Sequence, residues 1–153
     1  MTGVQTCALP IFRPGDHVLD VGCGTGYSSA VLSHLGASVV ALEEDAALAR
    51  PAEAALAAAG VRQVRFVEGP LPAGWPAGAP FDVILFEGAT EVVPNELGGQ
   101  LKPEGRLAAI FGSGPAGKAI IYRRIEGRLV GRPAFDAAAP VLPGFAAPVA
   151  FVF

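Results

Sequence analysis

A run of alternating glycines carries the clearest chemical signal in the sequence. The residues Asp20-Val-Gly-Cys-Gly-Thr-Gly-Tyr27 lie between a short apolar run and a stretch with apolar residues at helical spacing. Glycine lets the backbone turn tightly and approach a ligand closely, and the start of a following helix presents free N–H groups. Glu43 ends the next apolar run, where a carboxylate can reach both hydroxyls of a ribose. The loop, its flanking elements and this acidic residue together predict a site for a nucleoside-containing cofactor.

The spacing within the loop indicates which cofactor this is. A dinucleotide site usually has the pattern G-x-G-x-x-G, with the pyrophosphate at the helix N-terminus. Here Gly22, Gly24 and Gly26 alternate, and the acidic residue Asp20 precedes them. A carboxylate at the mouth of the site would repel a pyrophosphate, whereas it suits the ammonium and sulfonium charges of S-adenosylmethionine. We therefore predict S-adenosylmethionine, with a nicotinamide cofactor and a purely structural turn as the alternatives.

Strands and helices alternate along the chain and position the loop. The apolar patterns predict strands at 17–21, 38–42, 61–67, 81–86 and 106–111, and helices at 27–35, 46–59 and 95–101. The segments 119–125 and 128–135 have the pattern of a hairpin, and 149–153 that of an edge strand or a tail. Repeated strand–helix–strand units predict an α/β fold, a three-layer Rossmann-like sheet that is mostly parallel with an antiparallel C-terminal edge.

Length, charge and cysteine content restrict the class of protein. The chain has 153 residues, enough for one domain, and 52% of them are hydrophobic, which excludes a disordered chain. Its net charge of −3 argues against a nucleic-acid partner. No apolar run reaches the roughly 18 residues needed to span a membrane. Two cysteines allow at most one disulfide, which favours a reducing compartment and hence the cytoplasm.

The first dozen residues differ from the rest of the chain. Residues 1–12 have no basic start and no cleavage site after a long apolar run, so they make a poor secretory signal. They have the character of a translated adapter or assembly scar joined to the genuine chain at about Arg13, and a natural N-terminal arm is the alternative. We therefore expect residues 1–12 to be a scar or a disordered arm, and residues 13–153 to form a single S-adenosylmethionine-binding domain.

The remaining candidate residues favour structural roles. His17 and His34 stand alone, without the cysteine or acidic neighbours that a metal site requires, so no metal is expected. Trp75 is interpreted as a packing anchor, with a pocket wall as the alternative. Glu87, at the end of the fourth predicted strand, is either a cap or a functional residue at the ligand-facing edge. The arginines near the hairpin are interpreted as a solvated face: Arg123, Arg124, Arg128 and Arg132.

The residues 20–27 resemble motif I of the class I methyltransferases. Further along, Gly74-Trp75, Ala79-Pro-Phe-Asp82, Pro94-Asn-Glu-Leu97 and the run Gln100-Leu-Lys-Pro-Glu-Gly-Arg-Leu107 are similar to the protein-L-isoaspartate O-methyltransferase family, from about Arg13 to the C-terminus. The resemblance implies S-adenosylmethionine-dependent methyl transfer to the carboxylate of isoaspartyl residues in damaged proteins, which is protein repair. It also implies cofactor contacts from Asp20, Gly22, Gly24 and Gly26 at the methionine end and from Glu43 at the ribose; the remaining cofactor-site candidates are Cys23, Tyr27 and Glu68.

The chain departs from this family at two places. Family members usually carry Gly-Asp after the third strand, with the Asp near the adenine amino group, whereas here the residues are Glu68-Gly69-Pro70 and Glu68 would have to replace that Asp. The family's substrate motif, with a Ser or Thr beside the reacting carboxylate, lies upstream of motif I, where this chain has only the first dozen residues. Two alternatives therefore stay open: an inert cofactor-binding fragment, and a class I methyltransferase for a small molecule or RNA.

Overall fold

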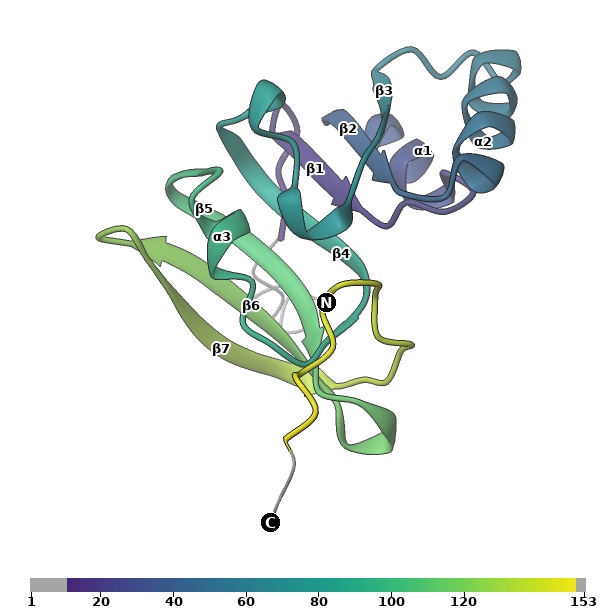
Figure 1. Ribbon diagram of the computed structural model, residues 1–153. Coiled ribbons are helices and arrows are strands. Elements are labelled where there is room, and N and C mark those ends of the chain that lie inside the picture. Colours follow the sequence, from purple (N-terminus) through teal and green to yellow (C-terminus); the bar gives the residue numbers. More distant parts are fainter. Residues whose placement is uncertain (1–10, 151–153) are drawn as a thin grey trace, which may run out of the picture.

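A seven-stranded sheet forms the centre of the protein (Figure 1). The structure is a computed structural model that describes residues 11–150. The strands lie in the order β3-β2-β1-β4-β5-β6-β7, with β1 to β5 parallel and β6 and β7 antiparallel. Their bounds are β1 His17–Val21, β2 Ser38–Glu43, β3 Val64–Glu68, β4 Phe81–Thr90, β5 Leu101–Phe111, β6 Lys118–Ile125 and β7 Arg128–Asp136. This arrangement confirms the predicted mostly parallel α/β sheet with an antiparallel C-terminal edge.

The helices lie on both sides of the sheet. They are α1 Tyr27–His34, α2 Ala46–Ala58 and α3 Asn95–Gly98, with short 3₁₀ turns η1 Leu71–Ala73, η2 Pro76–Gly78 and η3 Gly114–Ala116. Asp45 caps α2, because its side chain accepts a hydrogen bond of 2.8 Å from the N–H of Ala47. Figure 1 shows α1 and α2 beside β1–β3, and α3 beside β5.

Alternating strand side chains build a separate core on each side of the sheet, because successive residues of a strand point to opposite faces. Val18 and Val39 pack with Leu32 of α1 on one side, here called the α1 face. Leu19 belongs to a larger core on the opposite side, the α3 face, which includes Leu97 of α3. The result is the three-layer arrangement that the sequence predicts.

Several elements differ in length from the prediction: β5 begins at Leu101 rather than at residue 106, and the largest of the other differences concern β3, the third helix and β4. β3 begins at Val64 rather than Val61, because the N–H of Val61 still bonds Leu56 at the end of α2. The third helix ends at Gly98, because Leu101 is fully buried and already starts β5 beside Phe81. β4 continues to Thr90, because Ala89 and Thr90 still pair with the end of β5, and Ala89 also bridges to Val141.

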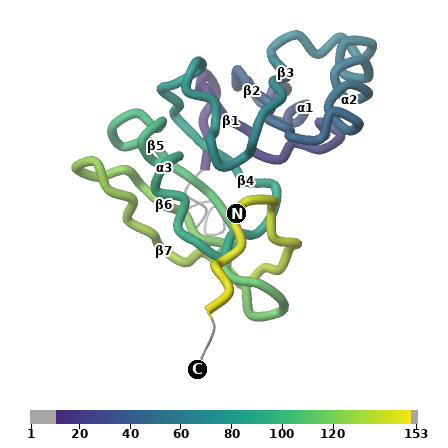
Figure 2. Tube along the Cα trace, viewed as in Figure 1, coloured from purple at the N-terminus to yellow at the C-terminus, as the bar shows by residue number. Residues whose placement is uncertain are grey.

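Residues 137–147, here called the C-terminal segment, run along the end of β4 (Figure 2). Ala89 donates its N–H to the carbonyl of Pro140 at 2.8 Å and accepts from the N–H of Leu142 at 2.9 Å. Phe145 is buried, with its ring edge-on to Phe86 at 5.0 Å. The predicted final strand lies partly outside the described residues, and its described part, 149–150, is not in a strand. The N-terminal prediction concerns residues 1–12, of which only Ile11 and Phe12 are described; both contact the core of the α1 face, and the prediction stays untested.

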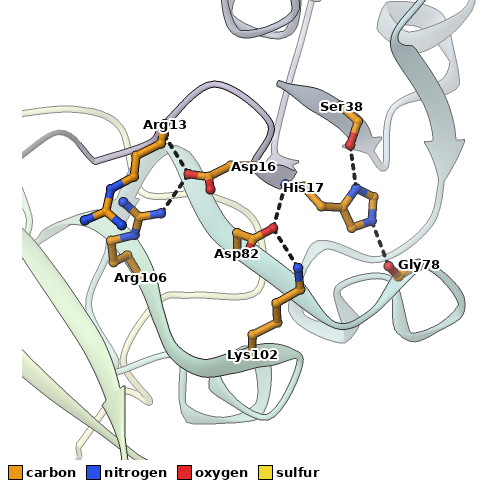
Figure 3. Close-up of polar contacts among 8 residues, drawn as sticks. All are labelled: Arg13, Asp16, His17, Ser38, Gly78, Asp82, Lys102 and Arg106. Carbon is orange, nitrogen blue, oxygen red and sulfur yellow. Dashed lines mark hydrogen bonds and ion pairs between the residues drawn. The ribbon is translucent and has the colours of Figure 1, made fainter. Parts of the chain in front are cut away.

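A network of polar side chains lies at the edge of the sheet opposite the glycine loop, where β1 and β4 begin (Figure 3). Asp82 accepts hydrogen bonds from the N–H of His17 at 2.8 Å and from Nζ of Lys102 at 2.9 Å. The His17 ring lies between the Ser38 hydroxyl and the Gly78 carbonyl and stacks on Phe81. Because the carbonyl only accepts, Nε2 of His17 carries the proton of that bond. These contacts give His17 the structural role that the sequence favours.

Candidate functional site

The glycine loop leaves β1 at the carboxyl edge of the sheet and leads directly into α1. Gly24 has φ of 54° and Gly26 has φ of 81°, a left-handed region that favours glycine. A Cβ on Gly26 would lie only 3.0 Å from the Phe66 ring, so this glycine is required by packing. A Cβ on Gly24 would meet nothing within 4 Å. Gly24 therefore borders open space, as a residue that receives a ligand must.

Asp20 lies behind the loop and fastens the first turn of α1 to the end of β1. Its side chain is fully buried, and its Oδ2 accepts hydrogen bonds from the hydroxyls of Ser28 at 2.8 Å and Ser29 at 2.6 Å. Its Oδ1 has no hydrogen-bond donor among the described residues. Burial, and next the nearby Glu87 carboxylate, raise the pKa of Asp20 to about 8, although the two serine hydroxyls lower it.

Glu43 bonds the glycine loop from the end of β2. Its carboxylate is buried, with Oε2 accepting from the N–H of Gly24 at 2.8 Å. Oε1 accepts from the N–H groups of Glu44 at 2.9 Å and Asp45 at 3.1 Å. Glu43 thus fixes the position of the glycine loop relative to the start of α2. Its predicted contact with ribose hydroxyls is not tested by this geometry.

Acidic residues lie at the ends of four neighbouring parallel strands. Glu68 ends β3 opposite Glu43 of β2, Asp20 lies near the end of β1, and Glu87 lies near the end of β4. The ion pairs given by the described residues join Lys102 to Asp82, Arg106 to Asp16 and Lys118 to Asp136, and none of them involves these four acids. This carboxyl edge therefore has a negative potential that opposes a pyrophosphate and favours a cationic ligand.

Cys23 lies inside the loop, with 5% of its surface exposed. Burial, and then the negative charges of Asp20 and Glu43, raise the pKa of its thiol to about 12. The thiolate is the reactive form of cysteine. Cys23 is therefore a poor nucleophile in the folded protein, and its part in the loop is that of a small buried side chain.

We expect Cys23 in a Cys7→Ser variant to react with a thiol reagent at pH 8 at least about 100-fold more slowly when folded than in urea, because both burial and the raised pKa withhold the thiolate. The measurement is the rate of chromophore release from a disulfide reagent. Folded and unfolded rates within tenfold of each other would show that the loop opens readily.

The structure places Tyr27 beside the glycine loop and Trp75 on the α3 face, and it adds three residues that the sequence did not reveal. Tyr27 is 78% exposed at the start of α1, and Trp75 packs half-buried against the core of the α3 face. Ser28 and Ser29 were missed, although two hydroxyls in the first helical turn beside a strand-end Asp are a readable signal. Leu142 was missed because no sequence pattern indicates it. A Cβ on Gly22 would lie 3.0 Å from the Leu142 side chain, and this contact depends on how the distant C-terminal segment folds back.

The sheet order, the glycine loop and the acidic strand ends together define a class I methyltransferase domain. A solved protein-L-isoaspartate O-methyltransferase matches with a TM-score of 0.79 at 28% identity, over 86% of this chain and 43% of that one. A Plasmodium falciparum structure in complex with S-adenosyl-L-homocysteine matches 86% of this chain and 67% of that one, with a TM-score of 0.68. At 18% identity, this second likeness supports the fold alone.

Sequence comparison narrows the class to one family. The model of the family "Protein-L-isoaspartate(D-aspartate) O-methyltransferase (PCMT)" matches residues 1–132. The protein-L-isoaspartate O-methyltransferase of Methylorubrum extorquens is 46% identical over 117 residues, which are 76% of this chain and 50% of that protein. The Methylorubrum populi enzyme is 44% identical over 142 residues, or 88% of this chain and 64% of that protein. The chain belongs to the protein-L-isoaspartate O-methyltransferase family, and it spans about half to two thirds of the length of these relatives.

Proposed function

We propose that this chain binds S-adenosylmethionine and carries the methyl-transfer site for the carboxylate of isoaspartyl residues in damaged proteins. The observation that carries the proposal is an open glycine loop bordered by carboxyl groups that take no part in the ion pairs of the described residues, in a chain of this family. The buried Oδ1 of Asp20, which no donor of residues 11–150 bonds, fits a ligand that brings N–H groups or positive charge.

The carboxyl edge offers a place for each part of the cofactor. Asp20 and the glycines would receive the methionine end, since Gly24 borders open space beside them. Glu43 would hold the ribose by exchanging part of its bonding to the loop. Glu68 would face the adenine in place of the family's Asp, since Pro70 has no polar side chain. Cys23 and Tyr27 complete the loop as its buried and exposed side chains.

Methyl transfer to a carboxylate does not require an acid or base side chain. When bound, S-adenosylmethionine supplies a methyl group on a positively charged sulfur. A carboxylate acceptor has a reference pKa of about 4, so near pH 7 it is already ionised and needs no general base. The chain's contribution is to hold the two reactants in contact, which can supply roughly 7–11 kcal/mol, and to exclude water as their opposite charges neutralise. No catalytic residue is therefore assigned.

Three further points complete the proposal. Among the described residues, no helix is long and apolar enough to cross a membrane. We place the protein in the cytoplasm, where the free thiol of Cys23 would stay reduced. The partner is an isoaspartyl-containing protein rather than a nucleic acid, in keeping with the net charge of −3.

The test is a methyl-transfer assay with two peptides that differ only in one isoaspartyl or aspartyl linkage. We expect base-labile methyl ester on the isoaspartyl peptide and none on the aspartyl control. Binding of S-adenosylmethionine without turnover would show instead an inert cofactor-binding fragment. Methylation only of an unrelated small molecule or RNA would move the chain to another acceptor class.

A further inference from the structure

Glu87 and Asp20 lie near each other on two neighbouring strands. Asp20 lies two residues after Val18, which packs on the α1 face, and Glu87 lies two residues after Leu85 of that face, where the register between β4 and β5 shifts. Asp20 is paired in register with Leu85, so Glu87 stands diagonally opposite Asp20 on the adjacent strand. Residues in this relation are within reach of a long side chain. Glu87 is exposed at the loop, and Asp20 is buried behind it.

The two carboxyl groups can bond each other only through a proton. Oδ2 of Asp20 is already used by Ser28 and Ser29, and Oδ1 has no donor among the described residues. Glu87 faces it, but an ionised carboxylate only accepts hydrogen bonds. One of the two groups must therefore hold a proton for the pair to bond, as in other carboxyl pairs that share a site.

We propose that Asp20 and Glu87 form one carboxyl pair that shares a proton in the free protein and releases it to solvent when the cationic methionine end of S-adenosylmethionine binds. The inference rests on the proposed function. Glu87 is then a positioning residue for the cofactor, because it sets the charge that Asp20 presents.

Among the groups that surround Asp20, the unit that titrates is the carboxyl pair of Asp20 and Glu87. Asp20 is faced by Ser28 and Ser29 of α1, by Cys23 of the loop and by Glu87 of β4. Glu43 of β2 acts with Asp20 and Glu87 on the Cys23 thiol, whose pKa of about 12 keeps it protonated throughout. The raised pKa of Asp20 agrees with a proton held near neutral pH. A cation at the loop removes the reason for holding that proton, because it supplies the positive charge instead.

The experiment is calorimetric titration of the full chain with S-adenosylmethionine in phosphate and in Tris, whose ionisation enthalpies differ. The enthalpy difference between the buffers gives the protons released. We expect a release approaching one proton near pH 7, and a Kd that falls by up to about tenfold per pH unit between pH 6.5 and 8. Glu87→Gln should release clearly fewer protons and show a weaker pH dependence, because it removes the contribution of Glu87 while the burial of Asp20 remains. Its amide can donate to Asp20, so the variant retains a bonded pair.

Glu44→Gln is the matched control, because it removes an exposed carboxylate next to Glu43. It should release as many protons as the wild type. The ammonium of the free ligand titrates identically in all three experiments, so the difference between wild type and Glu87→Gln reports the charge of the site that contains the pair. Equal proton release in these two proteins would overturn the inference while leaving cofactor binding intact. An absence of binding in the folded wild type would overturn both this inference and the proposed function.

Discussion

A Gly24→Val variant is expected to fold and to lose binding of S-adenosylmethionine by at least about 100-fold. The open space beside Gly24 lets a side chain fit without a clash, but that side chain fills the space where the methionine end would lie. A ligand at 100 times its Kd stabilises the native state by roughly 2.7 kcal/mol, which is about 5–10 °C in Tm for a chain of this size. The variant should show no such shift with the cofactor or with its demethylated product.

Gly60→Val supplies a control matched for backbone strain. Gly60 follows α2 with φ of +76°, against +54° at Gly24, and a Cβ there also meets nothing within 4 Å. Each substitution forces a branched residue into a left-handed conformation, at a cost of about 1–2 kcal/mol. Both variants should therefore melt earlier than the wild type, and only Gly60→Val should keep the full ligand shift. A Gly24→Val protein that retained the shift would place the cofactor elsewhere.

The fold was predictable wherever local pattern decides structure. The apolar run 17–21 and the hairpin turn at Glu126-Gly127 needed only neighbouring residues, and both are found as expected. The extension of β4 to Thr90 could not be predicted, because it depends on pairing with the end of β5 after a shift in register and on a bridge between Ala89 and Val141, all of them distant in sequence. A contact of that range leaves no periodic trace in either segment.

The position of Asp20 shows what a motif can and cannot predict. The motif identifies the residue, but the structure decides that its carboxylate points behind the loop, toward Ser28 and Ser29. Strand alternation contains part of this answer, since Asp20 lies two residues after Val18, on the side that packs against α1. The effect of Glu87 on the pKa of Asp20 could not be predicted, because it requires knowing that β4, and not β3, lies beside β1.

The Asp20→Asn variant is expected to gain stability over the wild type as the pH rises from 5 to 8. Burial and Glu87 raise the pKa of Asp20 from 3.8 to about 8, so between these values the folded state binds more protons than the unfolded state. The free energy of unfolding therefore decreases as pH increases across this window. Asparagine cannot ionise, yet its oxygen can still accept from Ser28 and Ser29 and its amide can donate to Glu87. The advantage of the variant should grow by between about 1 and 4 kcal/mol over three pH units, measured by urea unfolding.

Asp82→Asn is the control, because the fold lowers the pKa of this carboxyl instead of raising it. Although burial raises the pKa of Asp82, the His17 N–H and Lys102 lower it overall, so its charge stabilises the fold above the unfolded pKa, and this contribution is lost only at acidic pH. This substitution should therefore destabilise the protein by a similar amount at pH 5 and at pH 8. If the advantage of Asp20→Asn were equally constant, the buried carboxyl would be ionised in both states. A stabilised Asp20→Asn protein that binds S-adenosylmethionine more weakly would show that the buried acid costs stability and is kept for its charge.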